Sequence, residues 1–383
     1  MKRKTAVNTG IFLCLAFLLA ACQQTPKEVS ERMSGYGDNA QMSSDDIQYC
    51  TLSELQKTDI KDIHVSLDNM VLPDQVDFSQ IESVSTLELS FETNYTDERE
   101  RVAEVFGIDS GSLVEQPKDY QGRQFMYEAD GTYFVVCDDG FFSYFTGLDW
   151  QEKTHRGFQG QYDLDTEDVS GKSIEFGNGE KAEISEMCQK GEQWMNENIP
   201  LNGCRYHVTD AYVRELETKE GLRRQLSLGV DISYKGIRFN NYASSSGNDP
   251  ATHGIFADYD NVDMLSGFSI GTGLLKVDSE KPVEKLVDFE SAVKLANEKV
   301  SGFNQNKITK ILPLYMLQPE YETEKQVYSV PGQKVKARPV YAFMMKREDD
   351  SSEFGINKCN VYQVAAVDMV TGEVAVYFGG DNS

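Results

Sequence analysis

The apolar positions of this chain repeat mainly with the period of two that is typical of β-strands. Runs of this kind occupy residues 84–91, 205–217, 222–234, 237–242, 307–317, 338–347, 360–368 and 373–378. Three other segments repeat their apolar residues at the spacing of an amphipathic helix, namely residues 96–106, 184–195 and 288–300. The pattern therefore predicts a mixture of helices and antiparallel strands.

The ends of two of these helices carry recognisable signals. Thr96 is placed to cap the first helix and Gly107 to end it, because glycine adopts the left-handed conformation that closes a helix. Asp288 is placed to cap the last helix in the same way. These residues set the expected helix boundaries.

A β-meander is predicted at residues 123–145, where Asp130-Gly131 and Asp139-Gly140 separate three aromatic and β-branched runs. Its aromatic side chains could stack on sugars or grip a peptide, but strand residues this apolar usually face a core, and we expect a core. The aromatic residues of the meander are Phe125, Tyr127, Tyr133, Phe134, Phe141, Phe142, Tyr144 and Phe145.

The order of these elements, one helix and then three or more strands, recurs at least twice and predicts the α+β class, built from successive helix-plus-antiparallel-sheet units. We expect a signal peptide at 1–21, a flexible tether at 22–46 that is rich in polar residues, and three folded parts. The folded parts are an N-terminal domain with the meander at 47–172, a middle unit at 173–283 and a C-terminal unit at 284–383.

The N-terminus has the order of a bacterial export signal. Three basic residues precede an apolar run at 11–21, which is too short to span a bilayer and ends in Leu19-Ala20-Ala21-Cys22. This string resembles the lipobox of bacterial lipoproteins. The resemblance implies cleavage before Cys22, diacylglyceryl attachment to its sulfur, and a cell-membrane location facing outward. The alternative is an ordinary secretory peptide with an incidental cysteine.

The charge of the chain excludes some partners. Lys and Arg number 37 against 62 Asp and Glu, a net charge of −25, and loss of the three basic residues of the signal peptide makes it −28. Nucleic acids and anionic lipid surfaces are bound through basic patches, so neither is an expected partner. Hydrophobic content of 40% is sufficient for a core.

The string Gly267-Phe268-Ser269-Ile270-Gly271 matches the G-x-S-x-G pattern of serine hydrolases. That pattern needs a helix after the serine and a catalytic histidine later in the chain. Here a strand-like run follows, and all four histidines precede Ser269, namely His64, His155, His207 and His253. We therefore expect a strand with glycines at this position and no enzyme.

Metal and cofactor sites are not expected either. Cys188, Cys204 and His207 supply three possible ligands, whereas a structural zinc site takes four. Two acidic strings resemble calcium loops but lack the glycine and the glutamate of such loops. The first holds Asp163, Asp165, Glu167 and Asp168, and the second holds Asp258, Asp260 and Asp263. We expect both to be solvated loop acids, although a casual calcium site stays open.

Two further features stay open on sequence grounds. Five cysteines would remain in the folded part, either as buried free thiols or with one or two bridges, namely Cys50, Cys137, Cys188, Cys204 and Cys359. The polar segment 247–254 is either a ligand-contacting loop or an exposed connector.

The last hundred residues resemble a PepSY-type unit, through the helix that begins at Asp288-Phe289 and the strand-turn-strand of 362–374. The overall layout is similar to the extracytoplasmic YycH and YycI regulators, which restrain a sensor kinase, and to lipoproteins of Gram-positive anaerobes. These resemblances imply a regulatory role and supply no catalytic residue.

The sequence therefore predicts a non-catalytic, lipid-anchored extracytoplasmic protein that binds or regulates a protein or peptide partner at the cell envelope. A small-molecule or glycan-binding lipoprotein that uses the aromatic meander is the alternative. An envelope hydrolase is the third hypothesis, and the arguments against Ser269 count against it.

The lipid anchor gives the first prediction. Diacylglyceryl transfer needs the thiol of Cys22, so the native protein should partition into the detergent phase and the variant Cys22→Ala into the aqueous phase. Cys14→Ala, which alters the signal peptide at another cysteine, should behave as the native protein does. Mass spectrometry of the mature N-terminus checks the site, and a first residue other than Cys22, or Cys22 without acyl mass, would contradict the assignment.

Overall fold

The computed structural model describes residues 47–91, 95–119, 122–138, 141–147, 154–199, 201, 203–239, 255–270, 275–300, 306–319, 334–346 and 361–376. The predicted signal peptide, tether and Asp139-Gly140 turn lie outside the described residues, as do Cys22, Cys359 and the 247–254 segment. Residues Ile47–Ser383 belong to one compact unit. No helix of the described part of the chain is long and apolar enough to cross a membrane.

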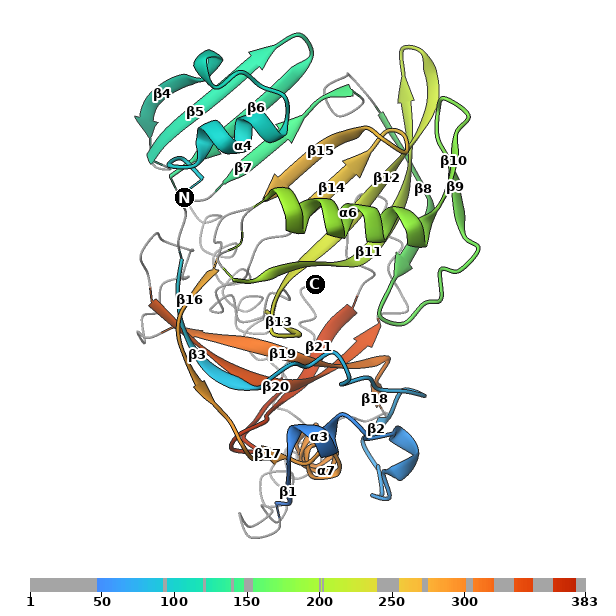
Figure 1. Cartoon of the computed structure of the whole chain (residues 1–383). Helices are drawn as coiled ribbons and strands as arrows, with labels where there is room; N and C mark the ends of the chain where they lie inside the picture. Colours follow the sequence, from blue (N-terminus) through green and yellow to red (C-terminus); the bar gives the residue numbers. More distant parts are fainter. Residues whose placement is uncertain are drawn as a thin grey trace, which may run out of the picture. The chain divides into compact units, whose positions relative to one another are not determined.

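One sheet of 16 strands dominates the described residues (Figure 1). Its strands form two groups joined through β13 (Ile237–Phe239). The upper group contains β4 (Val114–Asp119), β5 (Gly122–Ala129), β6 (Thr132–Cys137), β7 (Phe142–Phe145), β8 (Thr154–Asp163), β11 (Arg205–Thr218), β12 (Gly221–Tyr234), β14 (Ile255–Tyr259) and β15 (Leu265–Ile270). The lower group contains β3 (Ser85–Phe91), β16 (Leu275–Pro282), β19 (Lys310–Pro319), β20 (Lys334–Lys346), β21 (Val361–Asp368) and β22 (Val374–Val376).

Short elements accompany this sheet. Three two-stranded pairs are β1 (Tyr49–Cys50) with β17 (Leu286–Val287), β2 (Met70–Val71) with β18 (Asn306–Lys307), and β9 (Ser173–Glu175) with β10 (Lys181–Glu183). The described helices are α3 (Leu52–Leu55), α4 (Arg99–Val105), α6 (Ile184–Asn198) and α7 (Phe289–Lys299), with 3-10 turns at Ile60–Asp62 and Ser110–Ser112.

The joint between the two strand groups is a single short strand. β13 runs antiparallel to β12, where Arg238 is opposite Ser233, and parallel to β19, where Arg238 is opposite Leu314. All neighbouring strands within the upper group pair antiparallel, and so do those within the lower group. Arg238 therefore lies where the upper and lower groups meet.

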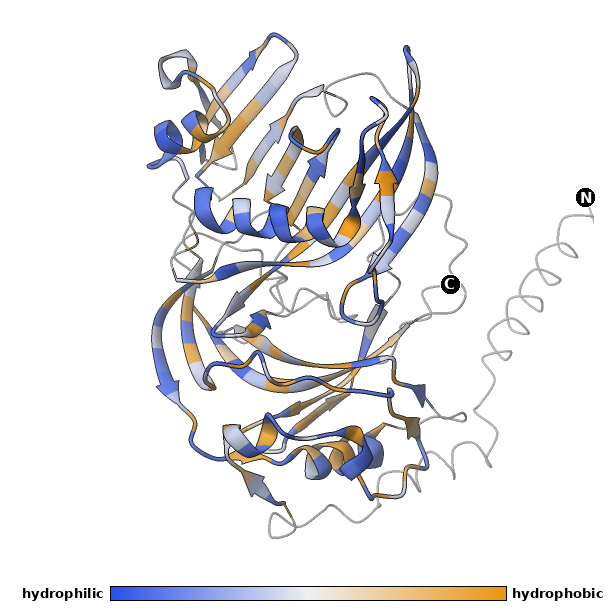
Figure 2. Ribbon diagram, turned by 45° about the vertical axis from the view of Figure 1, so that its right-hand side comes forward, coloured by the Kyte–Doolittle hydropathy of each residue, from blue (hydrophilic) through white to orange (hydrophobic). Residues whose placement is uncertain are grey.

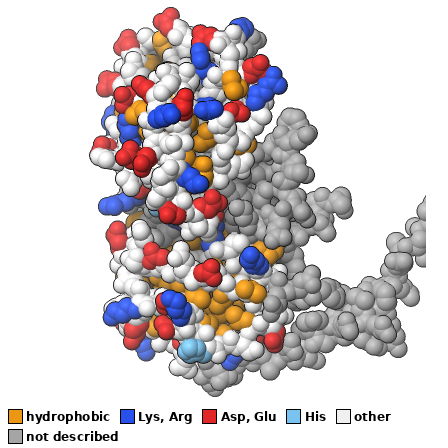
Figure 3. Space-filling view, turned by 90° about the vertical axis from the view of Figure 1, so that its right-hand side faces the viewer, with side chains coloured by type: hydrophobic (Ala, Val, Ile, Leu, Met, Phe, Trp, Pro, Cys, Tyr) orange, Lys and Arg blue, Asp and Glu red, His pale blue; other side chains and the backbone are white. Residues whose placement is uncertain are grey.

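Each strand group buries one face against a helix. α6 lies across β11, β12 and β14, and its Gly191 brings the helix against Leu228 and Tyr259. In the lower group Phe289 of α7 packs on Tyr341, with ring centroids 5.7 Å apart. Hydrophobic and hydrophilic residues alternate along the strands in Figure 2, as expected for strands with one buried face. In the side view of Figure 3 charges of both signs are scattered, and hydrophobic side chains gather on the lower half.

Several local predictions are confirmed. Helices form at 184–198 and 289–299, and the Asp288 carboxylate caps the latter by accepting from the Ser291 amide at 2.6 Å. The turn between β5 and β6 has Asp130 at φ 52° and Gly131 at φ 73°, and the meander continues through β7. Gly107 adopts φ 70° just beyond α4.

Three of the eight aromatic side chains of the meander are buried as expected, namely Phe125, Phe134 and Phe142, and the other five are only partly buried. Phe134 and Phe142 are fully buried. The rings of Phe106 and Phe268 contact Phe142, and Trp194 of α6 contacts Phe106 and Phe268. The predicted cap Thr96 was wrong. Its hydroxyl donates to Asp138 at 2.8 Å instead, and Glu98 precedes the helix without a side-chain cap.

The expected α+β architecture of successive helix-plus-antiparallel-sheet units is wrong. The protein is mostly sheet, with four α-helices among its described residues and one large mixed sheet in place of repeated units. The reason is non-local pairing: β3 lies between β16 and β20, which come from the expected middle and C-terminal units, and β7 pairs with β15. Strands therefore pair across the expected boundaries at 172/173 and 283/284.

Candidate functional site

A cavity of about 910 Å³ opens where the two strand groups meet. Its wall combines the loop after β2, the segment after β8, the ends of β11, β12 and β13, and the start of β19. The lining residues are Pro73, Asp74, Gln75, Val76, Asp77, Gln80, Leu164, Asp165, Thr166, His207, Ser233, Gly236, Arg238, Thr309, Lys310, Ile311, Leu312 and Pro313.

One glycine permits this arrangement. Gly236 forms the tight turn from β12 to β13 at φ 82°, a conformation that side chains rarely adopt. A Cβ atom at this position would clash with the backbone carbonyl of Gln80. The loop that forms one wall of the cavity therefore packs directly on the turn that leads into β13.

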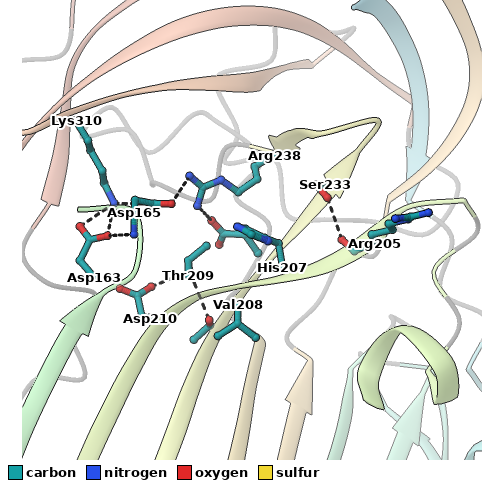
Figure 4. Close-up of polar contacts among 12 residues, drawn as sticks. Asp163, Asp165, Arg205, His207, Val208, Thr209, Asp210, Ser233, Arg238 and Lys310 are labelled. Atoms are coloured by element: carbon teal, nitrogen blue, oxygen red, sulfur yellow. Dashed lines mark hydrogen bonds and ion pairs between the residues drawn. The ribbon is translucent and has the colours of Figure 1, made fainter. Parts of the chain in front are cut away.

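A buried network of five charged side chains lies at the inner wall, and three of them line the cavity, namely Asp165, Arg238 and Lys310 (Figure 4). The Lys310 ammonium donates to both carboxylate oxygens of Asp163, at 3.0 and 2.9 Å, and to Asp165 at 2.9 Å. Arg238 donates to the other oxygen of Asp165 at 2.9 Å and lies 3.6 Å from Asp231. Each of the five side chains is at most 12% exposed.

The network connects both strand groups. Asp163 ends β8 and Asp231 belongs to β12, whereas Lys310 begins β19 and Arg238 is in the joining strand β13. Removing these charges from water is costly, and their mutual attraction must offset that cost. Three carboxylates against two cations leave one net negative charge within the network.

Burial by itself raises the pKa of Asp165, but the attraction of Arg238 and then of Lys310 outweighs it and holds the pKa below its ordinary value. Asp165 is therefore ionised at neutral pH. Its two oxygens accept from two different cations, so this carboxylate bridges β13 and β19.

A bulge in β11 shapes the neighbouring surface. The register shifts between Val208 and Asp210, and Asp210 then stands opposite Asp163 on β8. Two like charges directly opposite each other are unfavourable. Lys310 binds Asp163, and the Thr209 hydroxyl donates to Asp210 at 2.8 Å, so each carboxylate has a donor of its own.

His207, also on the cavity wall, pairs with α6. Its Nδ1 lies 3.2 Å from the carboxylate of Glu192, which also accepts from the Val208 amide at 2.8 Å. Burial alone raises the pKa of Glu192, but the hydrogen bonds from His207 and Val208 outweigh it and lower the pKa. His207 is thereby oriented by Glu192.

The serine and cysteine candidates lie apart from this wall. Ser269 is in β15 as expected for a strand, and its hydroxyl lies 3.0 Å from that of Ser143. Cys188 and Cys204 are free, buried thiols, and burial raises the pKa of each to about 12. Cys50 and Cys137 also form no disulfide with another described cysteine. Among the described residues no group of three or more His, Cys, Asp or Glu is arranged to hold a metal ion.

Several residues of the two acidic strings are buried, although all were expected to be solvated. Asp163 and Asp165 were expected to be solvated loop acids, and this was wrong, since both are buried in ion pairs; Asp168 is exposed as expected. In the other string Asp258 lies 3.6 Å from Arg214 inside the sheet, whereas Asp263 pairs with Lys190 near the surface.

Sequence reasoning missed Lys310, Arg238 and Asp231. Each stands in a run of apolar residues that forms a strand, and a charge in such a run is rarely buried unless it has a partner. This signal marks candidates for buried ion pairs but does not say which acid pairs with which base.

No model of a known protein family matches the chain, and no curated protein matches it. Among solved structures, the fold is similar to that of an uncharacterised protein from Eubacterium rectale ATCC 33656, known from a crystal structure. The identity is 12% and the TM-score 0.53, and the match covers 85% of this chain and 98% of the other. This likeness concerns the fold alone.

The buried network gives the second prediction. The variant Lys310→Met leaves Asp163 and Asp165 buried without their shared cation, and removing one partner of a buried pair typically costs about 3–5 kcal/mol of unfolding free energy. Lys235→Met, which removes the partly exposed partner of Glu280, should cost less than about 1 kcal/mol. Urea unfolding followed by circular dichroism measures both. Equal losses in the two variants would contradict the role given to Lys310.

Proposed function

We propose that this protein is a non-catalytic, lipid-anchored module on the outer face of the cell membrane, and that it binds a peptide segment of an envelope partner in the cavity at the joint. The cavity itself carries this proposal. Its volume of about 910 Å³ lies within the roughly 300–1,000 Å³ of typical ligand sites. The partner would be regulated or held through this contact.

The chemistry of the wall supports binding over catalysis. The charged groups of the inner wall are engaged with one another, and a general acid or base needs an accessible proton and a pKa near the working pH. Ser269 contacts Ser143, and His207 contacts Glu192, so these residues form no serine–histidine pair with each other.

Hydrogen-bonding groups on the wall suit a peptide. Gln75, Gln80 and Thr166 supply side-chain donors and acceptors, and the exposed backbone of a peptide offers one donor and one acceptor at nearly every residue. Val76 and Leu312 add apolar surface between the polar groups. Such a mixture of apolar surface and a few polar groups is typical of ligand sites.

A small-molecule-binding lipoprotein is the second candidate function, because the cavity volume also suits a small polar ligand. A glycan is supported less well than a peptide. Phe134 and Phe142 of the meander are buried in the core, and the described residues that line the cavity include no phenylalanine, tyrosine or tryptophan on which a sugar could stack.

The location rests on Cys22, whose lipid chains would hold the folded unit at the membrane. Two or three acyl chains give stable attachment, since each buried methylene contributes about 0.8 kcal/mol. The tether at 22–46 would then separate the cavity from the bilayer and leave it open to other envelope proteins.

Site-specific cross-linking in intact cells gives the third prediction. A photoreactive phenylalanine analogue at Gln75, an exposed residue of the cavity wall, should give a discrete adduct with one envelope protein. The same analogue at Leu222, which is 53% exposed in the β11–β12 hairpin, is the matched control and should give none. An absence of adducts at Gln75, or identical adducts from both positions, would contradict the proposal.

A further inference from the structure

Both cations of the cavity wall are already paired with buried carboxylates. An ammonium group has three N–H donors, and Lys310 donates three hydrogen bonds to the oxygens of Asp163 and Asp165. Arg238 is held between Asp165 and Asp231. A carboxylate or phosphate that entered would have to break these buried pairs, and each broken pair would leave a charge uncompensated.

The carboxylates, in contrast, outnumber the cations. Asp74 and Asp77 stand on the outer wall, in addition to Asp163, Asp165 and Asp231 of the network. Among the charged residues that line the cavity, the carboxylates of Asp74, Asp77 and Asp165 outnumber the cations of Arg238 and Lys310 by one. A carboxylate accepts several hydrogen bonds, so the exposed Asp74 and Asp77 can each receive a donor from a ligand.

The remaining wall is aliphatic. Val76, Leu164, Leu312 and the rings of Pro73 and Pro313 line it. A long alkyl stem with a charge at its end buries its methylenes on such a surface and keeps the charged end at polar groups. A guanidinium group would gain more from aromatic faces, on which it stacks, than from aliphatic ones.

We infer that the cavity receives an aliphatic ammonium group, the side chain of a lysine in the bound peptide, with Asp74 and Asp77 as its charge partners. This inference rests on the proposed function and names the chemistry of its ligand. The net charge of −25 agrees with it, because a strongly negative protein raises the local concentration of cations. The volume of about 910 Å³ accommodates the lysine together with neighbouring peptide backbone.

Calorimetric titration with a blocked glycine pentapeptide that has one central lysine tests the inference. The lysine peptide should bind at low ionic strength, and a matched peptide with Nε-acetyl-lysine should bind at least about tenfold more weakly, because acetylation removes the charge. Binding should weaken about tenfold in the double variant D74N/D77N. The amide oxygen that replaces a carboxylate oxygen of Asp77 can still accept from the Ser79 amide, so the loop keeps this hydrogen bond.

The double variant E115Q/E128Q is the matched control. It removes two exposed carboxylates from β4 and β5, at the opposite end of the strand order from the lower group, and its affinity should stay within about twofold of the wild type. Equal weakening in both double variants, or equal binding of the acetylated peptide, would overturn the inference.

Spermidine distinguishes a free polyamine from a lysine side chain. Spermidine binding that depends on Asp74 and Asp77, with no binding of the lysine peptide, would overturn the lysine assignment. The proposed function is tested separately: if Gln75 still gives its adduct in cells while the cross-linked partner segment contains no lysine, the proposed function stands and the inference falls.

Discussion

The contact on which this structure depends is the ammonium group of Lys310 between the carboxylates of Asp163 and Asp165. It joins the first residue of β19 to the end of β8, and Arg238 extends it to the strand that connects the two groups. A shift of one group against the other would separate these charges inside the protein and leave them unpaired, at a cost of several kcal/mol. The network therefore sets the relative position of the strand groups, and with it the shape of the cavity.

The backbone also stabilises the connection of the two strand groups at β13. Only glycine at 236 allows the β12–β13 turn to pack against the carbonyl of Gln80, and β13 itself contributes hydrogen bonds to β12 on one side and β19 on the other. Such a three-residue strand has little pairing energy of its own. The side-chain ion pairs around it supply the specificity that so short a strand lacks.

Local structure was predictable from local sequence. Asp288 and the apolar spacing after it located α7, and Asp130-Gly131 located the β5–β6 turn, because capping and turn conformation depend on a few adjacent residues. Strand partners were not predictable, because the periodicity of β3 is compatible with any neighbour, and its actual partners β16 and β20 are more than 180 residues away in the sequence. The helix-plus-sheet interpretation failed for this reason.

The candidate site, too, was predictable only where it depends on adjacent residues. The acids at 163 and 165 stood out in the sequence, but their cation is 147 and 145 residues away, and nothing local distinguishes a buried carboxylate from a solvated one. The alternating sequence around Ser269 predicted a strand, and Ser269 is in β15. Local sequence thus predicted the strand at Ser269 but not which distant residues the fold brings together.

The pH dependence of unfolding tests the central claim most directly. In the folded protein the pKa of Asp165 is lowered, so its ionised form stabilises the fold above its ordinary pKa of about 3.9, and this contribution is lost as the pH falls through the lowered value. Unfolding free energies of the wild type and of Asp165→Asn should therefore differ at pH 6, with the wild type more stable, and the difference should shrink steadily from about pH 4 downward. A difference that is the same at every pH, or a wild type no more stable than the variant at pH 6, would contradict the account.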